Sequence, residues 1–351
     1  MGLPTSRGAV PNSTPETLAP SRMGSGTEGV RLEPLPRGAN FVRAKMLWEI
    51  GLDVAGDPDI PYGGNRDMCI SVGSGGQADF RPSLKLASGS AVMAHDVVKG
   101  AVDMAFVNPS ALLTQAYRGV GMFDKKLPVR VVCSYPSWDR FAMVVHPKTG
   151  LKSVGDIKAK KFPLKVSVRE DPTHSTLVLI EQIFNHHGFG IRDMLNWGGQ
   201  LVTTGSPMGP KRMDPIKAGT VDAVFDEALV VWYGAALGAG YHNLIIEPDC
   251  LKAMVDLGWR KVTLKEGDYP NVKGTYDCID FSGWPIYCRE SLDEKVVIDV
   301  CEALVARQHE IPWTDIDYKG NIRQIFGESE ETPIDVPLHA GVEKFLRDNK
   351  L

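Results

Sequence analysis

Apolar and polar residues alternate along the chain in a way that predicts repeated units of one helix followed by one short buried strand. In the clearest unit, an amphipathic run that ends at Val98 stops at Gly100, and apolar residues then dominate 102–106. Glycine readily takes the left-handed backbone conformation that ends a helix. Asn108 and Pro109 follow, and we expect Asn108 to cap the next helix with Pro109 in its first turn.

The same pattern occurs a second time, over 216–229. The positions that match are Gly100 and Gly219, Val102 and Val221, Asp103 and Asp222, and Phe106 and Phe225. After its strand the second copy carries two adjacent acids, Asp226 and Glu227. Two copies predict two similar α/β lobes with the functional site between them. The alternative is two unrelated strand–helix units that share common turn chemistry.

Periodicity and turn residues place the remaining elements. Helices are expected over 41–55, 88–99, 177–187, 251–257, 292–307 and 340–349, and strands over 68–72, 129–133, 141–145, 164–168, 244–246 and 262–264. Capping boxes, in which a serine is followed three positions later by an acid, are expected at Ser153 with Asp156 and at Ser291 with Glu294. This alternation predicts an α/β fold whose strands are mostly parallel within each lobe.

Two segments are expected to carry the chain between the lobes. The first is the polar aromatic link 137–140, which lies between two strands that are nearly end to end. The second is the apolar run 278–287, interpreted as one bent strand broken by Ser-Gly-Trp-Pro. Lobe 1 then comprises 40–140 and 280–351, lobe 2 comprises 141–279, and residues 1–39, rich in Pro, Gly, Ser and Thr, form a disordered leader.

Composition narrows the class of protein. The chain has 351 residues, of which 43% are hydrophobic and 23% charged, and its net charge is −4. These values are typical of a globular protein of two domains and disfavour a nucleic-acid partner. Its six cysteines form no CxxC pair, and no HExxH or GxSxG motif occurs, so we expect no metal, no cofactor and no catalytic residue. A monomer or weak dimer is expected.

The residues alone do not determine in which cellular compartment the protein lies. The longest uncharged apolar run, 228–241, has 14 residues and is too short to span a membrane. No apolar core of the kind found in signal peptides follows Met1. Either the chain stays in the cytoplasm, or its export signal lies outside this sequence.

Polar side chains that follow the expected strands are candidates for binding a small anion. Arg169 comes at the end of one strand, and His174, Ser175 and Thr176 lie where the next helix begins. Unpaired backbone N–H groups at a helix start, together with a guanidinium, favour a carboxylate. The alternative is that Thr173 caps this helix while Arg169 pairs in solvent with Glu170 or Asp171.

Two further positions carry similar alternatives. Asp226 and Glu227 are expected to cap a helix, or else to accept an ammonium group or join the lobes. Ser74 and Gly75 belong to a glycine-rich turn after a strand, where backbone N–H groups can approach an anion. A plain flexible loop is the other interpretation of that turn.

Six segments resemble the TAXI-type solute-binding receptors of TRAP transporters. They are residues 99–113, 149–170, 218–229, 280–290, 311–313 and 337–345. The resemblance implies a type II periplasmic-binding-protein fold, with two α/β lobes, a two-stranded hinge and a ligand in the cleft. It also implies a periplasmic receptor that passes a small organic acid or amino acid to a TRAP-type membrane permease. By resemblance, ligand contacts fall on Ser74, Gly75, Asn108, Ser110, His174, Ser175 and Thr176.

The sequence therefore predicts a solute-binding protein whose lobes close on an anionic ligand around 141–145 and 279–287. Its predicted ligand-binding residues are Ser74, Gly75, Asn108, Ser110, Trp138, Arg140, Arg169, His174, Ser175, Thr176, Asp226, Glu227 and Trp284. One alternative is an enzyme on the same fold, such as a decarboxylase, an isomerase or a cofactor-biosynthesis enzyme. It would be marked by His174 close to Asp226 or Glu227, or by a buried reactive cysteine. A cytosolic small-molecule sensor is the third possibility.

Overall fold

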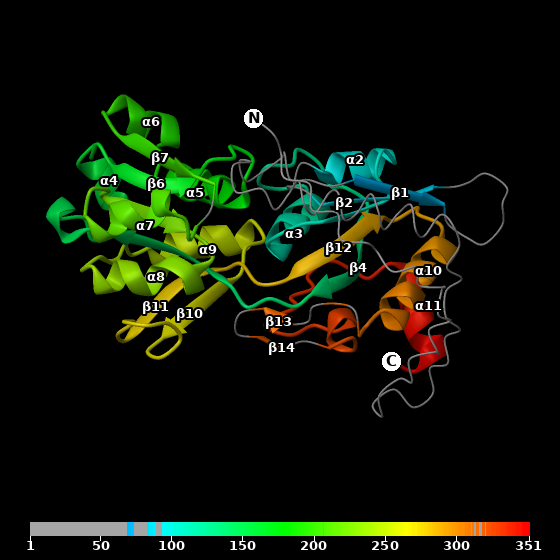
Figure 1. Cartoon of the computed structure of the whole chain (residues 1–351). Helices are drawn as coiled ribbons and strands as arrows, with labels where there is room; N and C mark the ends of the chain where they lie inside the picture. Colours follow the sequence, from blue (N-terminus) through cyan, green and yellow to red (C-terminus); the bar gives the residue numbers. More distant parts are fainter. Residues whose placement is uncertain are drawn as a thin grey trace, which may run out of the picture.

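A computed structural model describes residues 69–73, 83–88, 93–205, 207–309, 311, 314–315, 318–319 and 321–351. The leader 1–39, the helix expected over 41–55 and the turn containing Ser74 and Gly75 lie outside these residues. The described residues form two large sheets, each with its own helices, arranged as two lobes side by side (Figure 1). The predicted two-lobed α/β fold is thereby confirmed.

Lobe 1 is built on a five-stranded sheet in the order β1-β2-β3-β12-β4. Its strands are β1 (Cys69–Gly73), β2 (Ser83–Ser88), β3 (Met104–Phe106), β4 (Val129–Tyr135) and β12 (Trp284–Arg289). Its helices are α2 (Met93–Lys99), α3 (Ser110–Arg118), α10 (Glu294–Ala306) and α11 (Ala340–Asn349). A 3-10 turn, η3 (Gln324–Phe326), and a small hairpin, β13 (Thr314–Asp315) with β14 (Tyr318–Lys319), complete the described part.

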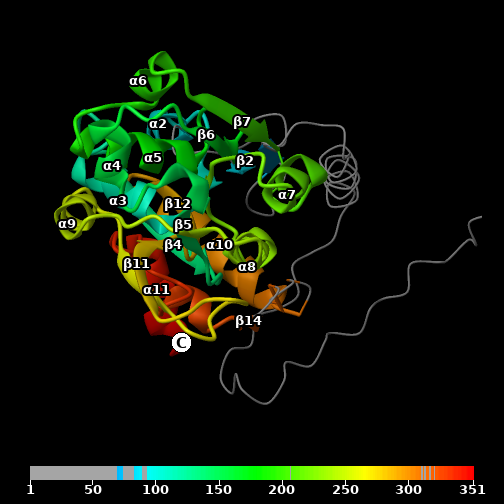
Figure 2. The ribbon, with the colours of Figure 1, turned by 90° about the vertical axis from the view of Figure 1, so that its left-hand side faces the viewer.

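Lobe 2 is built on a sheet in the order β10-β11-β5-β8-β6-β7, with β9 beside β5. Its strands are β5 (Arg140–Val145), β6 (Lys165–Arg169), β7 (Gln200–Thr204), β8 (Ala223–Asp226), β9 (His242–Asn243), β10 (Lys261–Lys265) and β11 (Thr275–Asp280). Its helical elements are η2 (Pro147–Thr149), α4 (Val154–Ala159), α5 (Ser175–His186), α6 (Ile191–Asn196), α7 (Pro210–Lys217), α8 (Leu229–Gly238) and α9 (Pro248–Asp256). Helices α4, α5 and α9 cover one face of this sheet, and α7 and α8 cover the other (Figure 2).

The sheets are mixed, so the expectation of mostly parallel strands is wrong. Strand β3 is parallel to β2, and β6 is parallel to β7 and to β8, but the other neighbours in the two large sheets are antiparallel. Part of the reason is that β5 and β12 adjoin the passages between the lobes. Strand β5 runs against β8, and β12 runs against β3, so each enters its sheet opposite to the strand–helix unit beside it.

The repeated sequence pattern marks equivalent places in the two lobes. Gly100 (φ +77°) ends the turn after α2, and Gly219 (φ +61°) does the same after α7. Strand β3 then lies between β2 and β12, and β8 lies between β5 and β6. Asp103 pairs with Arg289 of β12 at 2.9 Å, and Asp222 accepts a hydrogen bond of 2.9 Å from the backbone of Lys165 in β6. Each aspartate therefore ties its unit to a neighbouring strand.

Two expected helix caps are wrong. Pro109 itself stands at the N-cap of α3, and the side-chain amide of Asn108 instead donates to the carbonyls of Phe281 and Gly283, at 2.9 and 3.0 Å. Those carbonyls lie on the second passage between the lobes, where no strand partner satisfies them. In α10, Asp293 caps the helix by accepting from the backbone of Lys295 at 2.7 Å, in place of Ser291.

Of the other predictions about local structure, some are confirmed and others are wrong. The capping box of Ser153 and Asp156 at the start of α4 is confirmed. The helix expected over 88–99 is described over Met93–Lys99, and Ser88 belongs to strand β2 instead. No strand forms over 244–246, where the pairing with β5 has already ended at Asn243. Helix α6 and strand β7 have no counterpart among the elements expected from the sequence.

The chain passes between the lobes twice, once from β4 to β5 and once from β11 to β12 (Figure 1). The run 278–287 is thus two strands in different sheets. Backbone hydrogen bonds join the two passages: Phe281 N donates to Asp139 O at 3.0 Å, and Gly283 N donates to Ser137 O at 3.1 Å. The hydroxyl of Ser282 accepts from Asp139 N at 3.0 Å. We call residues 136–140 and 281–283 the crossover.

Apolar and amide contacts also join the lobes beside the crossover. The ring of Phe281 is stacked between Phe141 and Trp259, at centroid distances of 5.8 and 5.7 Å. Gln182 of α5 donates to Gln115 of α3 at 3.1 Å and accepts from the Trp259 indole at 2.6 Å. The lobes therefore share one continuous core cluster at this side.

Two glycines with the same left-handed conformation test how tightly the crossover is packed. A Cβ on Gly283 (φ +77°) would lie 2.7 Å from Pro333, whereas one on Gly267 (φ +98°) would meet nothing within 4 Å. We expect Gly267→Ala to lower the free energy of unfolding by about 1 kcal/mol through backbone strain. Gly283→Ala should lose roughly another 1–3 kcal/mol from overpacking, measured by urea denaturation. Equal losses would show that the crossover has room to adjust.

Candidate functional site

Charged side chains gather at the carboxyl ends of two neighbouring strands in lobe 2. Arg169 ends β6, Asp226 ends β8, and Glu227 follows it. Because β6 and β8 are parallel neighbours, their ends meet at one edge of the sheet, which is where open α/β sheets bind ligands. Only 3% of Arg169 is exposed, and Asp226 is fully buried. The cluster is thus withdrawn from solvent.

Two guanidinium groups hold Asp226. Nε of Arg169 lies 3.0 and 2.9 Å from the two carboxylate oxygens, and Nη1 of the fully buried Arg212 lies 2.8 Å from Oδ2. Arg169 also pairs through Nη2 with Glu227. Burial raises the pKa of Asp226, but the two positive charges outweigh it and hold the pKa below its usual value. Asp226 is therefore charged at neutral pH.

Neither sequence-based alternative for these residues describes the structure fully. Arg169 pairs with Asp226 and Glu227 rather than with Glu170 or Asp171. The expectation that the two acids cap the next helix is wrong, because Ala228 stands at the N-cap of α8 with φ +56° and no side-chain cap of its own. The carboxylate oxygens of Asp226 are already held by the two arginines.

Asp139 of the crossover links the first passage between the lobes to this cluster. Its Oδ2 accepts from the backbone of Ala228 at 3.0 Å, and its Oδ1 accepts from the backbone of Arg140 at 2.7 Å. Its carboxyl group is also hydrogen-bonded to that of Glu227. Burial, the negative charge of Glu227 and this hydrogen bond raise the pKa of Asp139 well above its usual value. A proton is therefore held between two carboxyl groups at the start of α8.

Arg140 and Trp138 bind other parts of the protein. Nη1 of Arg140 donates to Asp280 at 2.7 Å and to Ser282 at 2.5 Å, and Nη2 pairs with Glu330. The guanidinium of Arg140 lies over the ring of Trp138, 4.2 Å from its centroid. The indole N–H of Trp138 also donates to Glu330, at 3.0 Å. Both predicted ligand contacts thus help to fix the crossover.

His174 stands at the N-cap of α5, a position that the sequence reading gave to Thr173. Its Nδ1 accepts from the backbone N–H of Thr176 at 3.3 Å. Burial and the nearby positive charge of Arg169 lower the pKa of His174, so the ring is neutral at neutral pH, as an acceptor must be. Ser175 and Thr176 lie in the first turn as expected, and both are buried.

The other predicted contacts are less closely grouped. Asn108 binds the crossover, Ser110 begins α3 as a buried residue, and Trp284 is 38% exposed at the start of β12. The structure brings together Arg169, His174, Asp226 and Glu227. These four residues, together with Asp139 and Arg212, form what we call the charged cluster. Sequence reasoning missed the last two. Asp139 lies in the segment that the sequence analysis identified as a link between the lobes. No motif or pattern in the sequence marks Arg212 as a member of the site.

Three observations bear on other kinds of site, all within the described residues. No group of His, Cys, Asp or Glu side chains there is arranged to hold a metal ion. No helix in that part of the chain is long and apolar enough to cross a membrane. Cys133, Cys250, Cys278, Cys288 and Cys301 are free and buried, and burial raises the pKa of Cys250, Cys288 and Cys301 to about 12. A thiol with so high a pKa is a poor nucleophile.

No protein-family model matches the chain, and no curated protein matches it. Solved structures resemble it distantly. One is the glycine betaine/L-proline-binding protein ProX from Borrelia burgdorferi, at 15% identity and a TM-score of 0.35, over 62% of this chain and 67% of that protein. Lactococcal OpuAC complexed with glycine betaine has 12% identity and a TM-score of 0.34, over 74% of this chain and 82% of that protein.

A third similar structure is a periplasmic transporter, with 13% identity and a TM-score of 0.33 over 90% of both chains. Likenesses this distant assign no ligand and no partner to the chain. Function must therefore be inferred from the chain's own residues.

The raised pKa of Asp139 generates a prediction about stability. The folded state holds this proton more tightly than the unfolded chain, whose pKa is ordinary. The free energy of unfolding should therefore fall as the pH rises from about 4 through the raised pKa. Asp139→Asn keeps an oxygen for Ala228 N–H and offers an N–H to Glu227, so this fall should disappear.

Urea denaturation at a series of pH values measures the effect. The control is Asp214→Asn, because Asp214 is exposed on α7. This variant should retain the pH dependence of the parent protein. If Asp139→Asn retains it as well, the carboxyl pair does not hold the proton.

Proposed function

We propose that this protein is a solute-binding protein that captures a small organic acid or amino acid beside the crossover. The observation that carries the proposal is the charged cluster itself. Arg169, Asp226 and Glu227 meet at the carboxyl ends of parallel strands, and Asp139 joins them to the segment that links the two lobes. Titratable groups with shifted pKa values gather at functional sites more often than elsewhere.

The charges of the cluster favour a ligand that carries a carboxylate. The start of α5 lies beside Arg169 and carries the positive end of the helix dipole. Asp226 is fully buried and its charge is neutralised by two arginines, whereas the side chain of Glu227 is 12% exposed to solvent. An amino acid fits this arrangement, with its carboxylate at the start of α5 and its ammonium group at Glu227.

The partner and the location belong to the same proposal. Six segments of the sequence resemble TAXI-type receptors, which supports delivery of the solute to a TRAP-type membrane permease from outside the cytoplasm. The similar solved structures include glycine betaine-binding proteins, one of them of an ABC transporter.

A second candidate function is an enzyme acting on an organic acid. The observation in its favour is that the neutral ring of His174 lies close enough to Asp226 and Glu227 for their charges to affect its pKa. The route through a reactive cysteine, in contrast, is disfavoured by the raised pKa values of the buried thiols. A binding protein leaves its ligand chemically unchanged, whereas an enzyme converts it, so the fate of the ligand distinguishes the two functions.

Thermal unfolding with dicarboxylates, 2-oxo acids, aromatic acids and amino acids tests the proposal. A ligand at 100 times its Kd should add about 2.7 kcal/mol to the free energy of unfolding. We expect one of these classes to raise the melting temperature, and NMR to show the ligand unchanged after incubation. A ligand that is consumed would make the protein an enzyme. Failure of every class would contradict the proposed ligand chemistry.

His174→Asn then places the ligand. Asparagine is a good N-cap, so the variant should fold normally at neutral pH while the ligand loses the imidazole and binds about tenfold more weakly. The matched control is His146→Asn, because His146 caps η2 by accepting from Lys148 N at 3.2 Å, in the same lobe. Isothermal titration should give the control the affinity of the parent protein. Equal affinities for all three proteins would place the ligand elsewhere.

A further inference from the structure

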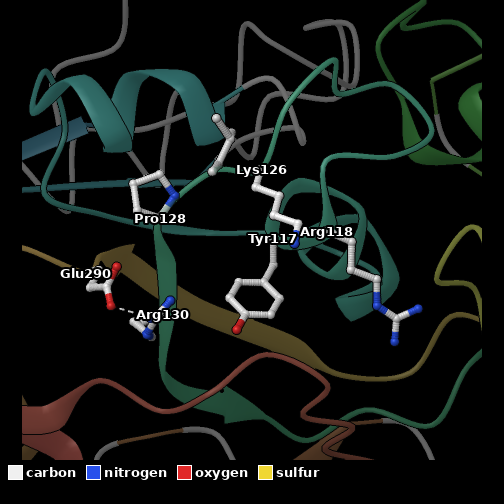
Figure 3. Close-up of a pocket in the computed structure, with 7 residues that line it drawn as sticks. Tyr117, Arg118, Lys126, Pro128, Arg130 and Glu290 are labelled. Atoms are coloured by element: carbon white, nitrogen blue, oxygen red, sulfur yellow. Dashed lines mark hydrogen bonds and ion pairs between the residues drawn. The ribbon is translucent and has the colours of Figure 1, made fainter.

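A cavity of 310 Å³ opens on lobe 1, apart from the charged cluster (Figure 3). Its walls come from the last turn of α3, from the loop that leads into β4, from β4 itself and from the residue after β12. Apolar surface is supplied by Tyr117, Leu127 and Pro128. Its volume is at the lower end of the range for small-molecule sites.

Positive charge dominates the cavity. Arg118, Lys126 and Arg130 line it together with one carboxylate, Glu290. The chain as a whole is acidic, with a net charge of −4, so this local excess stands out. Figure 3 shows Lys126 and Arg118 on one side of Tyr117, and Arg130 with Glu290 on the other.

The cations on the two sides are held differently. Arg130 is fixed, because Nη1 donates to Val129 O at 2.8 Å, Nη2 pairs with Glu290, and the guanidinium lies 5.5 Å from the Tyr117 ring centroid. Arg118 and Lys126 are exposed and make no ion pair with any described residue. Glu290 is thus occupied by Arg130, and two cations remain available to a ligand.

We propose that this cavity binds the phosphate group of a phosphate monoester. A phosphate monoester carries about 1.5–2 negative charges at neutral pH and three acceptor oxygens, enough to engage Arg118 and Lys126 together. A carboxylate has one charge and is satisfied by the arginine fork alone. The rings of Tyr117 and Pro128 provide a surface for an apolar group attached to the phosphate.

Phenyl phosphate, titrated into the full chain by calorimetry and two-dimensional NMR, tests this site. We expect binding to shift the signals of residues 117–130, and benzoate to bind more weakly. Arg118→Gln and Lys126→Gln should each weaken phenyl phosphate about tenfold, because each removes one charge-assisted hydrogen bond. Arg192→Gln and Lys344→Gln remove exposed cations elsewhere and should bind like the parent protein.

The source of the phosphate is tested in parallel with vesicles of phosphatidylcholine, with and without phosphatidic acid. Binding only to the acidic vesicles, lost in Arg118→Gln and Lys126→Gln, would place the phosphate on a lipid and support the site. The site is wrong if neither probe binds, if both substitutions leave binding unchanged, or if benzoate binds as tightly as phenyl phosphate. His174→Asn should not affect phenyl phosphate, which separates this site from the proposed solute site.

Discussion

The pairing of Arg169 and Arg212 with Asp226 and Glu227 is the constraint on which the centre of lobe 2 depends. A guanidinium buried this deeply needs a carboxylate, since an unpaired buried charge costs several kcal/mol, about 3–5 when one partner of such a pair is removed. Strands β6 and β8 and helix α7 supply three of these side chains, and Glu227 directly follows β8. Their ends must therefore stay in register for the cluster to remain neutral.

The geometry of the crossover depends on this cluster. The carboxyl group of Asp139, whose pKa is raised, is hydrogen-bonded to that of Glu227, and Asp139 also accepts from the backbone N–H of Ala228, the N-cap residue of α8. The next residue, Arg140, binds Asp280 and Ser282 on the second passage. Glu227 is therefore connected through hydrogen bonds to both segments that join the lobes. A solute that contacts Glu227 would act at the point where the lobes are linked.

Much of the fold could be predicted because its signals are local. Gly100 and Gly219 mark helix ends by their backbone conformation, and the strands that follow them are short apolar runs. Strand direction could not be predicted, because it depends on where β5, β11 and β12 enter their sheets. The prediction of a helix cap failed where the residue binds a partner distant in sequence, as Asn108 binds the carbonyls of Phe281 and Gly283. In the site, Arg169 and Asp226 were recognised separately, but a sequence gives no pairing between residues this far apart. Arg212 was missed for the same reason.

Hydrogen–deuterium exchange of the full chain, with and without the solute identified by thermal unfolding, tests whether the solute binds at the link between the lobes. We expect slower exchange at the starts of α5 and α8 and at both passages of the crossover, since a solute at Glu227 would order all of them. Protection confined to lobe 1, or absent from the crossover, would contradict a solute site at the link between the lobes.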